Sequence, residues 1–428
     1  MKRHPILALI LPAVFLLLPA CAPVPARAEE VHSDLPRDIS PQVADADLAE
    51  LVRGNNEFAF ALYPQLSAGG ENVFYSPYSI SIALAMTYAG AKGRTAEEMA
   101  QALHYTLSQD RLHPAFNKLA LELESRSRSE DLEPDQVFQL NVANSLWGQA
   151  GFAFEKDFLD TLARHYAAGM RLVDYEKDAE AARQKINDWV SQSTNQKIKD
   201  IIPQGALDAL TRLVLANAVY FKAAWAHPFE PDATQPGSFR LLDGTTVEVP
   251  TMQEQASLRS ITAEGYRAVE LPYAGWQLSM LILLPDEGDF EAVQARLDSG
   301  FIDGVVSGLQ SGEVLLAMPK FKFEWSLGLV DGLKALGMRD AFDPEAADLS
   351  GMDGQRDLYI TDILHKAYVA VDETGTEAAA ATTVIVGTAS MPAEPIEFKI
   401  DRPFFFLIRD NPTGTILFLG RVTNPAAE

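Results

Sequence analysis

The side chains that usually carry out enzyme chemistry form no recognisable set in this sequence. It contains no G-x-S-x-G, no H-E-x-x-H, no phosphate-binding G-x-x-x-x-G-K and no G-x-G-x-x-G. The seven histidines, at positions 4, 32, 104, 113, 165, 227 and 365, include no pair at the spacing of a helical metal site. The one cysteine, Cys21, leaves no thiol nucleophile in the rest of the chain. We therefore expect a protein that is not an enzyme and that has no metal or other cofactor.

A run of small residues near the C-terminus carries the most information. Residues 371–386 read V-D-E-T-G-T-E-A-A-A-A-T-T-V-I-V. One interpretation is a short exposed helix, capped by Thr376 and propagated by the alanines. The strand-like run His365–Val371 before it and the β-branched cluster Thr382–Val386 after it oppose that interpretation. The segment is therefore ambiguous locally, and its small side chains suit a strand that slides between two existing strands.

The elements that would position this run begin with helices. Apolar residues at helical spacing predict helices over Leu48–Leu66, Ile80–Ala89 and Ala179–Ser193. A further helix is predicted to start at Thr95 as N-cap, with Glu98 closing a capping box.

Strand signals dominate later in the chain. Runs rich in β-branched, aromatic and leucine residues predict strands over Leu213–Phe221, Leu278–Leu284, Val314–Phe323 and Phe404–Leu407. Their nearly continuous hydrophobicity indicates strands covered on both faces. The mixture predicts an α+β protein with large sheets.

Composition limits the classes of partner. The chain has 428 residues, of which 47% are apolar, so a large core is expected. A net charge of −24 disfavours nucleic acid and anionic lipid surfaces as partners. The stretch from Lys118 to Arg128 mixes bases with acids, which gives no evident heparin site.

The N-terminus has the form of an export signal. Lys2, Arg3 and His4 precede an apolar stretch, Ile6–Leu18, that is too short to span a membrane. Leu18-Pro19-Ala20-Cys21 resembles a lipobox, which predicts lipidation at Cys21 and a membrane contact only through that anchor. The competing prediction is cleavage after Ala26-Arg27-Ala28 and a freely secreted protein. We assign residues 1–20 to a lipoprotein-type export signal, 21–46 to a flexible tether and 47–428 to one domain without disulfides.

Several blocks in order resemble the serpin family, from about residue 50 to Pro425. Glu373-Thr374-Gly375-Thr376-Glu377 with the alanines is similar to the hinge of inhibitory serpins. Four further blocks are similar to serpin segments: residues 72–80, NVFYSPYSI; residues 141–147, NVANSLW; residues 215–222, LANAVYFK; and residues 401–404 with 418–422, DRPF and FLGRV. The chain is therefore identified as a bacterial, exported member of that family.

The resemblance implies a fold and a mechanism. The fold would have three β-sheets, about eight or nine helices and an exposed reactive-centre loop at about 373–395. A protease would attack the loop and form an acyl-enzyme. The cleaved loop would then insert into the main sheet as a new strand and carry the protease with it. Residues 376–389 would span roughly 45 Å at about 3.3 Å per residue.

The resemblance also implies roles for individual residues. Counting 15 residues from Gly375 places the reactive bond between Ala389 and Ser390, with Thr388 and Met391 as neighbouring alternatives. Gly375 would be the pivot, and alternate residues from Thr376 would face the core after insertion. The residues implied for three regions are: hinge, Glu373, Gly375, Thr376, Glu377, Ala378, Ala379, Ala380, Ala381 and Thr382; shutter, Ser76, Ser79, Asn217 and His365; breach, Lys320, Glu373 and Trp225.

Three functions follow from these observations. The first is a monomeric inhibitor that traps an elastase-like or subtilisin-like serine protease covalently. The second is a non-inhibitory serpin that acts as a carrier or chaperone, which the small hinge residues disfavour. The third is a secreted hydrolase, which lacks a catalytic motif.

Overall fold

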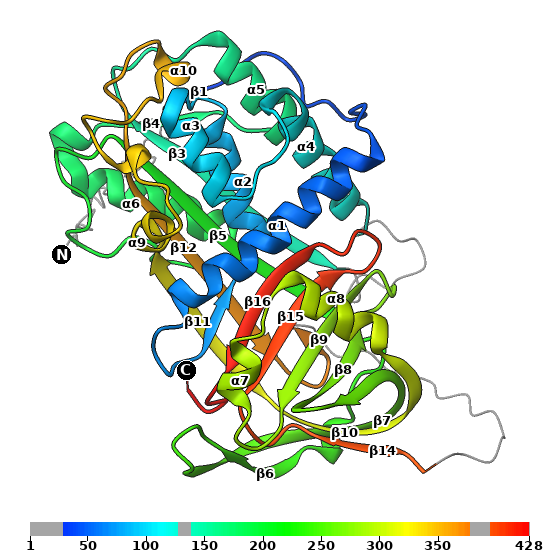
Figure 1. The fold of residues 1–428 in the computed structure, drawn as a ribbon. Helices are drawn as coiled ribbons and strands as arrows, with labels where there is room; N and C mark the ends of the chain where they lie inside the picture. The colour runs from blue at the N-terminus through cyan, green and yellow to red at the C-terminus, as the bar shows by residue number, and fades with distance from the viewer. Residues whose placement is uncertain (1–28, 127–137, 377–393, 428) are drawn as a thin grey trace, which may run out of the picture.

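Two large β-sheets organise the computed structural model, which describes residues 29–126, 138–376 and 394–427 (Figure 1). In the described part of the chain the first sheet has seven strands in the order β1 (Glu29–Val31), β4 (Met170–Val173), β3 (Gln139–Gln149), β5 (Leu213–Ala224), β13 (Gly375–Thr376), β12 (Ile360–Val371) and β11 (Phe321–Gly328). The second has nine: β14 (Ile396–Lys399), β10 (Gln310–Pro319), β7 (Thr246–Ala263), β8 (Tyr266–Pro272), β9 (Leu278–Pro285), β15 (Phe404–Asp410), β16 (Ile416–Val422) and β2 (Val73–Tyr75), with β6 (Gln235–Arg240) beside β7.

The fold is the α+β architecture that the sequence predicts, with one difference in how its strands connect. Three sheets were expected. Two of them share the long strand β7, so the described strands form two continuous hydrogen-bonded sheets. The N-terminal part of β7 pairs with β6, its centre with β10 and its C-terminal end with β8.

Ten α-helices and two short 3-10 helices accompany the sheets in the described residues, close to the eight or nine expected. They are α1 (Asp45–Leu66), α2 (Pro77–Tyr88), α3 (Gly93–Ala102), α4 (Gln109–Arg126), α5 (Lys156–Tyr166), α6 (Tyr175–Ser193), α7 (Phe290–Gln294), α8 (Ser299–Gly308), α9 (Val330–Ala335), α10 (Ser350–Asp353), η1 (Pro231–Ala233) and η2 (Asp340–Phe342).

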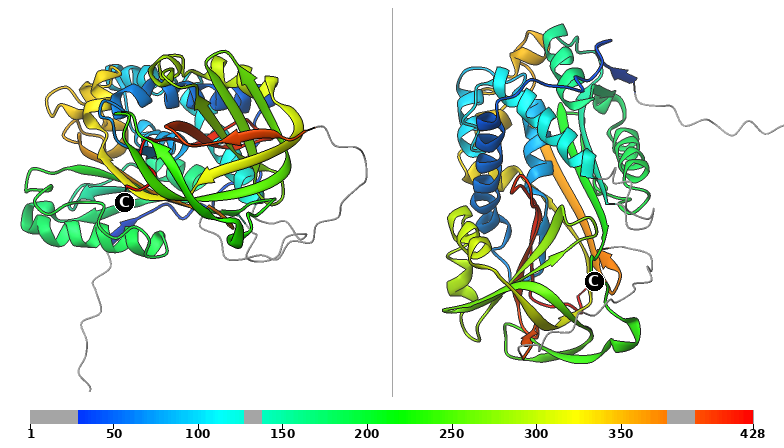
Figure 2. Two further views of the ribbon diagram at one scale, coloured as in Figure 1. Left: turned by 90° about the horizontal axis from the view of Figure 1, so that it is seen from below. Right: turned by 90° about the vertical axis from the view of Figure 1, so that its right-hand side faces the viewer.

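Strand β5 is covered on both faces, as its continuous hydrophobicity predicts. Leu213, Leu215, Val219 and Phe221 belong to the main core, whereas Val214, Ala216 and Ala218 pack in a second core under α6. Figure 2 shows α6 on one face of the seven-stranded sheet and α1 to α3 on the other. Asn217 therefore lies on the main-core face of β5, in line with large apolar side chains.

Two helix starts differ from the sequence prediction for identifiable reasons. Helix α2 begins three residues earlier than expected because Ser76 Oγ accepts a hydrogen bond from the Ser79 amide, and Pro77 occupies the first helical position. The capping box at Thr95 and Glu98 is wrong. Thr95 Oγ1 instead accepts from the Asp348 amide, and Glu98 accepts from the amides of residues 339 and 340.

The run predicted as one strand, Val314–Phe323, is divided between the two sheets. Strand β10 ends at Pro319, and β11 begins at Phe321 in the other sheet. Lys320 stands between them, with its amide donating to the Pro250 carbonyl at 2.8 Å. The crossing fixes Lys320 where the two sheets meet.

Residues 29–46, expected as part of a flexible tether, instead pack against the domain. Strand β1 pairs with β4 over three residue pairs. Arg37 binds Glu124 at 2.6 Å and Asn117 at 2.8 Å, and the Asp38 amide donates to the Arg164 carbonyl at 2.9 Å. The composition of this segment gives no sign of these tertiary partners.

Strand β1, at the start of the described chain, and strand β14, near its C-terminal end, lie at opposite ends of the molecule. Strand β1, where the described N-terminus begins, lies at the end of the molecule that contains α5 and α10 (Figure 1). Strand β14, which follows residues 377–393, lies with β6 and β10 at the opposite end.

Candidate functional site

The region of interest is the boundary between β5 and β12, which we call the seam. The two strands are parallel and paired over eight residue pairs, from Leu213–Ile360 to Tyr220–Tyr368. Parallel pairs have slanted hydrogen bonds and are slightly less stable per residue than antiparallel pairs. Beyond Tyr220 the strands no longer pair with each other, and β13 lies between them.

The hinge already occupies one end of the seam, beside the last residues of β5, which we call the hinge end. Thr376 is opposite Ala223 on β5 and opposite Val371 on β12, antiparallel to both. Its side chain is fully buried, and its Oγ1 lies 2.8 Å from Tyr273 Oη. Thr376 was expected to enter the sheet only after cleavage, so this is a correction: Thr376 already lies between β5 and β12.

Gly375 is required by close approach of the backbone. A Cβ atom at this position would lie 2.1 Å from the Ala223 carbonyl oxygen. The turn before it is held by Asp372, whose Oδ1 accepts from the Thr374 amide at 2.9 Å and from its hydroxyl at 2.7 Å. Glycine is therefore what lets the chain reverse from β12 and press against β5.

The predicted breach residues do come together above the hinge. Lys320 Nζ donates to Glu373 Oε2 at 2.7 Å, and Thr234 donates to Oε1 at 2.8 Å. Trp225 donates from Nε1 to the Asp372 carbonyl at 3.0 Å. Burial raises the pKa of Glu373, but the hydrogen bonds from Lys320 and Thr234 lower it more, so the carboxylate is held ionised.

The four predicted shutter residues also converge, at the middle of the seam. Ser76 donates its amide to His365 Nε2 at 3.3 Å and its hydroxyl to the Leu417 carbonyl at 2.7 Å. Asn217 donates to Ser79 Oγ at 2.6 Å, and its Oδ1 is hydrogen bonded to His365 Nδ1. The network joins α2, β5 and β12 across the seam.

His365 is a neutral imidazole in this network. It is completely buried, which lowers its pKa from 6.5 to about 3. A hydrogen on Nδ1 donates to Asn217, and Nε2 then accepts from Ser76, so one tautomer satisfies both contacts. Protonation would remove the acceptor that Ser76 uses.

Asn144 on β3 is a fifth member that the sequence analysis missed. Its Oδ1 accepts from Asn217 and from Ser79 Oγ, and its Nδ2 donates to the Ser79 carbonyl at 3.1 Å. The signal available was its register, since Asn144 is directly opposite Asn217. Tyr273 and Thr234 were missed as well, because a tyrosine in a strand and a threonine in a loop are unremarkable in a sequence.

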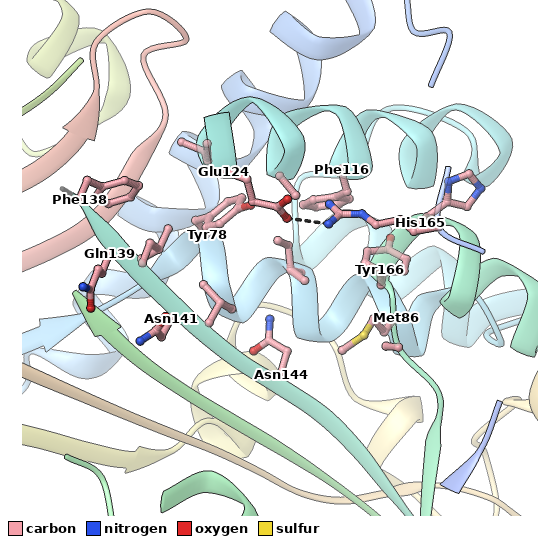
Figure 3. Close-up of a pocket in the computed structure, with 17 residues that line it drawn as sticks. Tyr78, Met86, Phe116, Glu124, Phe138, Gln139, Asn141, Asn144, His165 and Tyr166 are labelled. Carbon is pink, nitrogen blue, oxygen red and sulfur yellow. Dashed lines mark hydrogen bonds and ion pairs between the residues drawn. The ribbon is translucent and has the colours of Figure 1, made fainter. Parts of the chain in front are cut away.

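A cavity of about 500 Å³ adjoins the shutter on the β3 side (Figure 3). Asn144 lines it together with Tyr78 and Phe116, and so do both partners of the Arg37–Glu124 ion pair. Residues 139–142 of β3 are only partly buried, whereas the facing stretch of β5 is buried throughout except at Lys222. This end of β3 is therefore more exposed than the part of β5 that it pairs with.

The other predicted site residues lie outside the described residues: Cys21, Glu377, Ala378, Ala379, Ala380, Ala381, Thr382, Ala389 and Ser390. The lipidation site and the reactive bond therefore stay predictions. Among the residues that the structure describes, no group of three or more His, Cys, Asp or Glu side chains could hold a metal ion. Within the same ranges, no helix is both long and apolar enough to cross a bilayer.

Comparison with known proteins agrees with this arrangement. The family model described as serpin (serine protease inhibitor) matches residues 53–425. The chain belongs to the serpin family. An uncharacterized serpin-like protein of Thermococcus kodakarensis is 39% identical to this serpin over 409 residues, covering 95% of this chain and 93% of the relative.

Two further similarities concern an inhibitor and a solved structure. The leukocyte elastase inhibitor of Xenopus tropicalis is 38% identical over 377 residues, covering 86% of this serpin and 97% of the relative. The crystal structure of the thermophilic serpin tengpin in the native state superimposes with a TM-score of 0.82 at 29% identity, covering 93% of this chain and all of tengpin. The family and the Xenopus relative are both described as protease inhibitors.

Proposed function

We propose that this serpin is a suicide-substrate inhibitor that traps a serine protease as an acyl-enzyme by inserting its cleaved loop into the seam. The observation that carries the proposal is Thr376, buried between β5 and β12 with backbone pairing to both. Because Thr376 is already paired with both strands, the direction and register in which the rest of the loop would insert are set before cleavage.

The register of β13 predicts where each later residue would lie. Continuing the antiparallel pairing one residue at a time puts Ala378 opposite Phe221, Ala380 opposite Val219 and Thr382 opposite Asn217. The same count on the other side puts Thr382 opposite His365. An inserted Thr382 would therefore stand at the shutter, where the contact between Asn217 and His365 must separate.

The small hinge residues fit the side chains that they would meet. Thr376 faces the main core, so every second residue after it, beginning with Ala378, would face the same way. On that face β5 presents Phe221 and Val219. Alanines beside them add a strand without overfilling a dense core, where each extra methylene is costly.

Insertion also improves the hydrogen bonding of the sheet. The eight parallel pairs of the seam would be replaced by antiparallel pairs on both sides of the new strand. The uncleaved form is then held by a kinetic barrier, which the shutter contributes to, rather than by equilibrium stability. Trapping succeeds when insertion is faster than hydrolysis of the acyl-enzyme.

The expected target is a protease with a shallow primary pocket, because the residue before the predicted bond is Ala389. A relative described as an inhibitor of leukocyte elastase is in keeping with this choice. The test is incubation with elastase-like, subtilisin-like and trypsin-like enzymes. We expect a complex that survives boiling in detergent, near one-to-one stoichiometry, and a small C-terminal fragment that starts at Ser390. Cleavage of the loop without any covalent complex would support a non-inhibitory serpin instead.

We further propose that the chain is exported and anchored through Cys21. The support is the basic, apolar and Leu18-Pro19-Ala20-Cys21 sequence at the N-terminus. A multiply acylated N-terminus would hold the protein in the detergent phase, and Cys21→Ala would release it. Detergent partitioning that does not depend on Cys21 would favour cleavage near Ala28 and a soluble product.

A further inference from the structure

A tyrosine from the nine-stranded sheet reaches the hinge strand of the seven-stranded sheet. Tyr273 directly follows β8, and its Oη lies 2.8 Å from Thr376 Oγ1. Both side chains are fully buried. Within the described residues, this contact is the only hydrogen bond that either hydroxyl makes. Burial raises the pKa of Tyr273, so its hydroxyl stays protonated and can donate as well as accept.

The orientation of the Tyr273 ring is fixed by its neighbours. The ring stacks on Trp225 with centroids 4.6 Å apart and an angle of 9° between the planes. It also meets Phe221 edge-to-face at 5.3 Å. The backbones of Tyr273 and Trp225 form an antiparallel bridge, so the main chain is held together with the ring. The hydroxyl is therefore presented to Thr376 from a rigid support.

Trp225 connects this support to the turn before the hinge strand. Its backbone amide donates to the Thr374 carbonyl at 2.9 Å, and its indole Nε1 donates to the Asp372 carbonyl at 3.0 Å. These two contacts hold the turn, whereas Tyr273 holds the side chain of Thr376 in the strand that follows. Strand β13 has only two residues, so few interactions keep it between β5 and β12. One side-chain hydrogen bond is therefore a substantial share of them.

We propose that the Tyr273 hydroxyl positions Thr376 and thereby keeps β13 docked between β5 and β12 in the free serpin. The consequence for inhibition rests on the proposed function, because insertion would then start from a strand that is already paired. Docking itself is a property of the free serpin and can be measured without a protease. Removing one of the two hydroxyls leaves the other buried and unpaired, which is costly, whereas removing both leaves neither unpaired.

The test is a double-mutant cycle on the full chain, with Tyr273→Phe, Thr376→Val and the two changes together. Phenylalanine keeps the stacked ring, and valine keeps the shape of threonine. The matched control is Tyr175→Phe, because Tyr175 is also buried and its hydroxyl donates to the Trp147 carbonyl at 3.2 Å in the second core. Hydrogen exchange over residues 372–376 is measured in the free serpin by mass spectrometry. The ratio of covalent complex to cleaved serpin is then measured with a protease that the wild type traps.

We expect each single change at the hinge to raise the exchange rate of residues 372–376 by about fivefold, which corresponds to the loss of one ordinary hydrogen bond. The double variant should return to within about twofold of the wild type. Because only the docked fraction is ready to insert, the ratio of complex to cleaved serpin should fall by about twofold in the single variants and recover in the double variant. Tyr175→Phe should lower the unfolding midpoint but change neither the exchange rate nor the ratio.

Exchange in Tyr273→Phe that is no faster than in Tyr175→Phe would overturn the positioning role. A double variant that exchanges as fast as either single variant, or faster, would overturn it too. Faster exchange without any loss of trapping would overturn insertion that starts from docked β13. Failure of the wild type to form a covalent complex would instead overturn the proposed function and leave the exchange result standing.

Discussion

The middle and the hinge end of the seam hold the same two strands together in different ways. At the middle, Asn217 and His365 meet in a fully buried network of neutral polar groups that reaches α2 and β3. At the hinge end, β13 already separates the strands, and the part-exposed Lys320–Glu373 ion pair lies beside it. The two strands are thus apart at the end where the proposed insertion would start, and joined where that insertion would have to continue. Four changes test this comparison.

The largest effect is expected from Thr376→Arg at the hinge end. A long cation would replace a buried hydroxyl between two strands, and burying an unpaired charge costs several kcal/mol. Because each ~1.4 kcal/mol slows a step tenfold, hydrolysis should overtake insertion. We expect a protein that is cleaved at the same bond but traps less than about a tenth of the protease. The measurement is the ratio of covalent complex to cleaved serpin on a denaturing gel.

The control for this change is Glu377→Arg, since the alternation along the strand predicts that residue 377 faces the opposite way from Thr376. It should trap nearly as well as the wild type. Equal trapping by Thr376→Arg and Glu377→Arg would contradict insertion that proceeds from Gly375.

Next in size is Asn217→Ala in the middle of the seam. It removes the partner of His365 Nδ1 and one of the two side-chain partners of Ser79 Oγ, and a buried polar group left unpaired costs about 1–3 kcal/mol. We expect a lower unfolding midpoint and a faster loss of inhibitory capacity on warming. Asn187→Ala is the matched control, because Asn187 on α6 is also buried but its side chain hydrogen bonds to the backbone of residues 201 and 202, away from the seam. It should lower the unfolding midpoint while leaving inhibitory capacity at moderate temperature unchanged.

A smaller effect should come from pH. Burial lowers the pKa of His365 from 6.5 to about 3, so the unfolded chain binds more protons than the folded one between these values. This contribution to stability is complete above pH 6.5 and is lost as the pH falls toward 3, by up to about 3 kcal/mol at pH 4.5. His113 behaves in the same way, because burial lowers its pKa to about 3 as well.

The pH dependence separates the middle of the seam, which holds His365, from the end that holds the hinge and Glu373. The pKa of Glu373 is lowered from 4.5, so its contribution is retained at higher pH and is lost only as the pH falls below about 4.5. Urea unfolding at pH 7, 5.5 and 4.5 should show a decline that is reduced in His365→Gln and unchanged in Glu373→Gln. A decline in stability that is unchanged in His365→Gln but reduced in Glu373→Gln would contradict a neutral His365.

The smallest effect is expected from Lys320→Met. Its side chain is 36% exposed, and pairs of this kind contribute about 1 kcal/mol or less and weaken in salt. We expect a slight rise in the rate of loop insertion and almost no change in unfolding. Lys156→Met, which breaks the exposed Lys156–Asp160 pair on α5, is the control and should change neither. An effect as large as that of Asn217→Ala would mean that the breach, not the shutter, locks the seam.

Much of the fold follows from local patterns in the sequence. The unbroken apolar run of β5 predicts a strand covered on both faces, and it packs against both cores. Ala179–Ser193 is predicted as a helix, and α6 has its break at Asp178, immediately before that range. The crossing at Lys320 is not predictable from periodicity, because β10 and β11 form one apolar run and only the sheets distinguish them.

The site depended on the resemblance more than on spacing. Ser76 and His365 are 289 residues apart, and nothing local connects them. Asn144 was missed because a polar residue in a strand looks like a solvent-facing position. The insertion of Thr376 was missed because it depends on the gap between two strands, and the capping box failed because residues distant in the sequence took both of its side chains.

Strand β1 has a consequence for how copies of this protein meet one another. An open sheet edge offers unpaired amides and carbonyls to the edge of a neighbouring molecule, which is a route to aggregation. Here β4 does not end the sheet, because three residues from the N-terminal segment cover it. Two of them, Glu29 and Glu30, are exposed carboxylates, so the outermost strand is short and negatively charged. This margin of the seven-stranded sheet thus leaves little on which a second molecule can dock.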